Sequence, residues 1–135
     1  MSTKTQRIIG WVLTGLLGIL LIGGSGVAKF IDFPDKKKMF DHLGITDDLS
    51  PVLGIIEITV TLIFLIPRTS FVGAILLTAY LGGAVWAHVR VGDSWIFPVI
   101  LGVIVWVALG LRQPAIFALA LGQSPVSSNL PANGK

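Results

Sequence analysis

The chain has 135 residues, of which 53% are hydrophobic and only 13% are charged, with a formal net charge of +3. Soluble domains usually carry about 25% charged residues, so this deficit indicates an integral membrane protein rather than a soluble enzyme. Cysteine is absent, which excludes disulfides, thiolate metal sites and thiol exchange within the chain.

Four apolar runs predict four helices, at residues 8–28, 49–66, 69–87 and 95–111. Each run is close to the ~17–25 residues that a helix needs to cross a bilayer. The first run is longer than the core of a signal peptide, so we expect it to be retained. The pattern predicts an all-α, up-and-down four-helix bundle in the membrane over residues 1–122, followed by a disordered tail at 123–135.

The charged connection between the first two runs predicts a short helix that lies at the membrane surface. Asp32 would cap this helix, Pro34 would take its first position and Gly44 would end it. Ser50 and Pro51 would start the next helix in the same way.

Polar side chains predict one candidate site. Glu57 follows the small and polar residues Ser50 and Gly54 along one helical face. An ionised carboxylate in lipid costs at least ~2.5 kcal/mol, so Glu57 needs a partner or a proton. Up-and-down threading brings the following residues into one half of the bundle, as a predicted ligand pocket: Lys29, Glu57, Tyr80, His88, Arg90 and Asp93.

The alternative interpretation of Glu57 is a structural hydrogen bond that holds helices together. A metal site is not expected, because one His, one Glu and no Cys fall short of the usual ligand set. No catalytic residue can be named.

The basic residues leave the orientation in the membrane undecided. One side would hold Lys4, Arg7, Arg68, Arg112 and Lys135, and the other Lys29, Lys36, Lys37, Lys38 and Arg90. The positive-inside rule therefore gives a tie. Because these residues are scattered at helix ends, where they anchor to headgroups, nucleic acid is not an expected partner.

Several short segments resemble the DoxX-like family. They are Ser-Gly-Val-Ala-Lys at 25–29, Leu-Gly-Ile-Ile-Glu at 53–57, Ile-Pro-Arg-Thr at 66–69, the run at 73–84, His-Val-Arg-Val-Gly-Asp at 88–93, and the run at 97–102. The resemblance covers about residues 8–112. It implies a four-helix membrane bundle in the inner or plasma membrane, with both termini in the cytoplasm.

The resemblance also implies a redox association, since the family takes its name from a small subunit of a thiosulfate:quinone oxidoreductase. The chain has no flavin, haem or iron–sulfur signature, so a quinone or a partner subunit would have to carry the electrons. The first hypothesis is thus an accessory subunit that binds a quinone-like or other amphipathic ligand around Glu57.

Two other hypotheses stay open. One is a non-catalytic membrane scaffold or assembly factor, and the other is a small proton-coupled transporter. The expected partners are the lipid bilayer and either a redox subunit or a second copy of the chain.

Overall fold

The computed structural model describes residues 2–123, and this part of the chain is helical and contains no strand. α1 (Thr3–Gly18) continues into the π-helical η1 (Ile19–Gly26) and the 3-10 turn η2 (Val27–Lys29). The other helices are α2 (Lys36–Leu43), α3 (Leu49–Leu65), α4 (Ser70–Arg90), α5 (Ile96–Arg112) and α6 (Ala115–Ala120). The predicted all-α fold is confirmed. The tail prediction at 123–135 lies, except for Gln123, outside the described residues.

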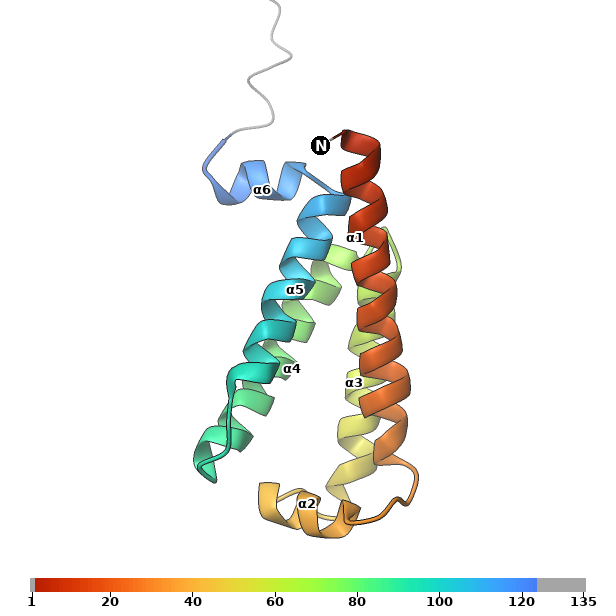
Figure 1. Cartoon of the computed structure of the whole chain (residues 1–135), viewed down its shortest axis with the longest axis vertical. Helices are drawn as coiled ribbons and strands as arrows, with labels where there is room; N and C mark the ends of the chain where they lie inside the picture. The colour runs from red at the N-terminus through yellow and green to blue at the C-terminus, as the bar shows by residue number, and fades with distance from the viewer. Residues whose placement is uncertain (1, 124–135) are drawn as a thin grey trace, which may run out of the picture.

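The long helices lie side by side (Figure 1). α1 packs against α5, α5 against α4, α4 against α3, and α3 contacts α1 and η1. The N-terminus and α6 lie at one end, which we call the α6 end. α2 and the connection between α4 and α5 lie at the opposite α2 end. Residues at the end of η2 and at the start of α3 are therefore neighbours.

Two helical stretches, Thr3–Lys29 and Ser70–Arg90, are long and apolar enough to cross a membrane. Only 28% of the most apolar window of each is buried, whereas the core helix of a soluble protein would be mostly buried. α3 and α5 are shorter apolar helices of 17 residues each.

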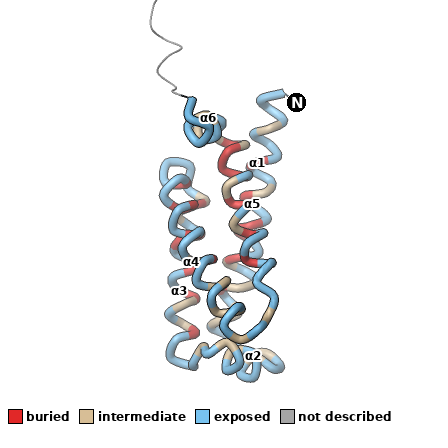
Figure 2. The backbone as a smooth tube through the Cα atoms, turned by 90° about the vertical axis from the view of Figure 1, so that its left-hand side faces the viewer, coloured by how far each residue is buried: buried red, intermediate tan, exposed pale blue. Residues whose placement is uncertain are grey.

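The structure exposes large apolar side chains and buries charged ones, an arrangement that is unfavourable in water. Large apolar side chains cover the outside; Ile19, for example, is 73% exposed and Trp86 67%. The buried positions of the described residues all lie in α1, η1, α3, α4 and α5, and Figure 2 shows them in red along these helices. The interior holds an apolar core that includes Phe64, but it also holds Glu57 and Arg112. Extensive apolar surface marks contact with a partner or a lipid phase.

Two predicted helix starts are wrong by a few residues. α2 begins at Lys36, after Asp35 in a left-handed conformation with φ 63°, so Pro34 precedes the helix and Asp32 does not cap it. α3 begins at Leu49, and the Ser50 hydroxyl donates to the Lys29 carbonyl oxygen at 2.8 Å instead of capping. Gly44 ends α2 with φ 76°, as predicted, because glycine adopts this conformation without steric cost.

Candidate functional site

Glu57 projects from α3 into the interior, where its side chain is 2% exposed. Its Oε2 atom accepts three hydrogen bonds from residues on other elements. Lys29 Nζ donates at 2.5 Å, Ser25 Oγ at 3.1 Å and Tyr80 OH at 3.1 Å. A single carboxylate oxygen thereby joins the end of the first helical stretch, α3 and α4.

Lys29 is held in place by the chain that precedes it. Its Nζ donates to the Ser25 carbonyl oxygen at 3.2 Å and to Ser25 Oγ at 2.9 Å, besides its bond to Glu57. An ammonium group has three N–H donors, so these three acceptors satisfy it fully. Ser25 lies in η1, one helical turn before Lys29, and it contacts both members of the ion pair.

Two glycines allow the close approach that this cluster requires. A Cβ atom on Gly26 would lie 2.7 Å from Ile58 Cγ1, and one on Gly54 would lie 2.6 Å from Phe30 Cε2. Both contacts are shorter than real Cβ atoms show. The absence of side chains at these positions lets η1 pack tightly against α3, which brings Ser25 and Lys29 within reach of Glu57.

The ion pair is shielded from water, since the Lys29 side chain is 10% exposed and that of Glu57 is 2% exposed. Attraction between opposite charges is strong in such surroundings, and an uncompensated charge there is costly. All the hydrogen bonds to the carboxylate reach Oε2, and within residues 2–123 none reaches Oε1. Oε1 is therefore left as an acceptor for a further donor.

A surface hollow of about 480 Å³ reaches the cluster from the α2 end. Its lining includes Lys29 and Ser50, together with Phe30, Lys36 and Phe40, but not Glu57. The hollow thus includes Lys29 and does not enclose the carboxylate. Lys36 Nζ donates to the Lys29 carbonyl oxygen at 3.2 Å, so α2 covers this side of the cluster.

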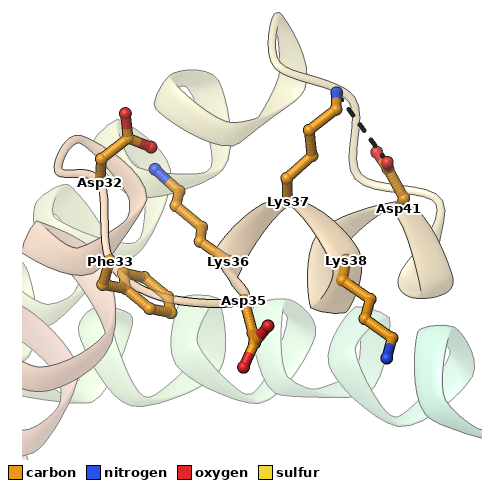
Figure 3. A pocket seen from close by; sticks show the side chains of 7 residues that line it. All are labelled: Asp32, Phe33, Asp35, Lys36, Lys37, Lys38 and Asp41. Carbon is orange, nitrogen blue, oxygen red and sulfur yellow. Dashed lines mark ion pairs between the residues drawn. The ribbon is translucent and has the colours of Figure 1, made fainter.

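Figure 3 shows a second, wider hollow beside α2, of about 580 Å³. Side chains of both charge signs line it, and Lys37 and Asp41 are paired across 3.9 Å. Such exposed pairs contribute little to stability. This hollow is an open charged surface that shares Asp32, Lys36 and Lys37 with the first hollow.

The six predicted site residues separate into two groups. Lys29, Glu57 and Tyr80 meet at Oε2. His88, Arg90 and Asp93 form no hydrogen bond with them; Arg90 and Asp93 instead contact α2, and His88 lies beside Asp93.

In the second group, Asp93 Oδ2 lies 3.0 Å from His42 Nε2 and 3.7 Å from His88 Nδ1. Arg90 Nη2 donates to the Leu43 carbonyl oxygen at 2.7 Å. The reason for the separation is distance along α4, because His88 follows Tyr80 by about 12 Å of helix axis. The group ties α2 to the connection between α4 and α5.

Three polar residues with notable contacts or burial were not among the predicted site residues. Ser25 could have been included, because it precedes Lys29 by one helical turn on the same face. His42 gave no sequence signal, since its partner Asp93 is distant in the chain. Arg112, interpreted as a headgroup anchor, is buried at 6% exposure near the α6 end. Within residues 2–123 no group of three or more His, Cys, Asp and Glu side chains is arranged to hold a metal ion.

These features define a small all-helical protein of the membrane class, with a buried ion pair between apolar helices. Residues 12–108 match the model of the DoxX-like family, and the chain belongs to this family. Comparisons with curated proteins and with solved structures give no match.

Proposed function

We propose that the protein spans the plasma membrane four times, through Thr3–Lys29, α3, α4 and α5, as an up-and-down bundle with both termini in the cytoplasm. The apolar outer surface and the burial of the charged residues Glu57 and Arg112 support this placement. The 17 residues of α3 and of α5 correspond to about 26 Å of helix, close to the ~30 Å hydrocarbon thickness. α2 would then lie at the outer surface of the membrane.

Within this frame the protein acts as an accessory subunit that binds a quinone-like or similarly amphipathic ligand beside Glu57. The observation that carries the proposal is the buried Lys29–Glu57 pair whose Oε1 atom accepts no hydrogen bond from residues 2–123. A hydroxyl group of the reduced, quinol form of the ligand would donate to Oε1, and its apolar part would lie among the lipid-facing side chains. Ionisable groups kept inside apolar helices are costly and commonly functional.

A redox role requires electron transfer that the described side chains do not supply. The ligand and a partner subunit would carry the electrons, while Glu57 and Lys29 would orient the polar head and hold its proton. The partner could be a redox subunit, and a second copy of the chain is the other arrangement that fits the proposal.

The test is purification in mild detergent, extraction of bound lipids and measurement of thermal unfolding with added ubiquinol or menaquinol analogues. We expect a co-purified quinone and a higher unfolding temperature for the wild type, both lost in Glu57→Gln. The matched control is Thr78→Val, which removes the Trp106–Thr78 hydrogen bond of 2.9 Å between α5 and α4 without touching Glu57. Absence of quinone, or an equal response in Glu57→Gln, would contradict the proposal.

A scaffold role is the second candidate, and a specific observation favours it. The three donors of Lys29 are satisfied internally, and the neighbouring hollow does not include Glu57. A purely structural role, in which the ion pair holds the helices together, requires no ligand. If Glu57→Gln accumulates normally and supports growth like the wild type, the scaffold role is favoured; lost function at normal abundance would reject it.

A further inference from the structure

Arg112 is a buried cation at the end of α5 nearest α6. Its side chain lies between two aromatic rings, with Cζ 4.0 Å from the Trp11 ring centroid and 5.5 Å from that of Phe64. Nη1 donates to Thr14 Oγ1 at 3.1 Å. The aromatic faces stabilise the positive charge but offer no anionic acceptor.

The rest of the guanidinium group is unsatisfied. Nε and Nη2 are buried and have no hydrogen-bond partner within residues 2–123. A buried charged group usually has a counter-ion and a complete set of hydrogen bonds. In the described part of the chain no acidic residue pairs with Arg112, and all seven acidic residues of the sequence lie between positions 32 and 93. Within residues 2–123 the buried guanidinium group therefore has no counter-ion.

Close packing of α1 against α5 fixes the base of the Arg112 side chain. A Cβ atom on Gly10 would lie 2.9 Å from Arg112 Cγ and 2.9 Å from its backbone nitrogen. On the same helix, a hollow of about 350 Å³ is lined by Lys4, Arg7 and Trp11, among others. Trp11 therefore contacts Arg112 and also borders a basic surface, where an anion would be attracted.

We propose that Arg112 binds the phosphate group of an anionic phospholipid, with Lys4 and Arg7 adding longer-range attraction for the same negative charge. The planar guanidinium group can offer Nε and Nη2 as two parallel donors to phosphate oxygens. Trp11, 42% exposed, covers the guanidinium group and would swing aside on binding. The acyl chains would follow the apolar face of α1, where Ile8 is 53% and Val12 55% exposed.

This site is independent of the ligand proposed at Glu57, because it lies at the opposite end of the helices. The experiment measures the thermal unfolding temperature of detergent-solubilised full-length protein after addition of phosphatidylglycerol, phosphatidylcholine or inorganic phosphate. We expect phosphatidylglycerol to raise the unfolding temperature of the wild type by several degrees, phosphatidylcholine to raise it much less, and phosphate alone to have no effect. Added salt should reduce the rise.

Arg112→Gln should lose the rise, whereas Arg68→Gln, which removes an exposed cation at the same end, should keep it. Arg112→Lys serves if the glutamine variant does not accumulate; it keeps the charge without the paired donors and should show a smaller rise. If Arg112 had only a structural role, its replacement would lower the unfolding temperature in the absence of lipid. The rise caused by added lipid would then be the same in the variant and in the wild type. That result, or a full rise with inorganic phosphate alone, would overturn the lipid assignment.

Discussion

At the scale of single residues, the Glu57 carboxylate is stabilised by charge and by geometry together. Lys29 supplies the opposite charge, while Ser25 and Tyr80 add hydroxyl donors to the same oxygen. The Glu57 side chain is only 2% exposed, so bulk solvent compensates little for the loss of any of them. The protein should therefore be stable when both charges are present or both are absent, and less stable when only one of them remains.

Lys29→Met should destabilise the protein by about 3–5 kcal/mol, because it leaves the buried carboxylate without a counter-ion. The double variant Lys29→Met/Glu57→Leu should recover most of the loss, since a buried ion pair can be replaced by apolar side chains at little cost. Thermal unfolding of the single and double variants checks this. A double variant no more stable than Lys29→Met would mean that the pair is not the main source of the effect.

Tyr80→Phe removes one donor and keeps both charges. We expect a smaller loss, of about 1.5–3 kcal/mol, which is typical of a hydrogen bond to a charged group. The same unfolding measurement gives the comparison with Lys29→Met. Equal losses in the two variants would indicate that Tyr80 also fixes the position of α4.

At the scale of elements, the contact between η1 and α3 determines whether the ion pair can form. The π-helical turn and the glycines at this contact place Ser25 and Lys29 opposite Glu57. π-helical turns occur frequently at functional sites. Gly23 offers a natural comparison, because a Cβ atom there would meet no atom within 4 Å, although it lies in the same π-helical segment.

Gly26→Ala should therefore destabilise the protein by about 1–3 kcal/mol, the usual effect of overpacking, and should loosen the Lys29–Glu57 contact. Gly23→Ala should be neutral or slightly stabilising, because alanine restricts the unfolded chain. Measuring the unfolding temperatures of the two variants tests this difference. Similar values for both would contradict a tight η1–α3 contact.

The sequence predicted most of these elements because apolar runs of this length leave few alternatives. The predicted run at 49–66 corresponds to Leu49–Leu65, and that at 95–111 to Ile96–Arg112. Lys29 and Tyr80 were foreseeable partners of Glu57 from helical spacing and threading. The π-helical turn was not, because its bonding carries no local signal in a run of leucine, isoleucine and glycine. Likewise, a terminal arginine such as Arg112 has the same sequence signature whether it is buried or extended to headgroups.

At the scale of the whole molecule, the two ends differ in charge. Among the described residues, the α6 end carries Lys4, Arg7, Arg68 and Arg112 without an acidic residue, whereas the acidic residues gather toward the α2 end. The count of basic residues alone gave a tie, and acidic residues contribute little to orientation. The orientation proposed for the DoxX-like chain therefore needs a direct measurement.

The absence of cysteine makes that measurement simple, since a single introduced cysteine is the only thiol of the protein. Lys38→Cys lies on α2 and Arg68→Cys at the turn between α3 and α4, at opposite ends of the helices; both side chains are exposed. With the termini in the cytoplasm, a membrane-impermeant maleimide should label position 38 in intact cells and position 68 only after permeabilisation. The cysteine-free wild type is the control. The reverse pattern would invert the proposed topology, and labelling of both positions in intact cells would contradict a bundle that crosses the membrane between them.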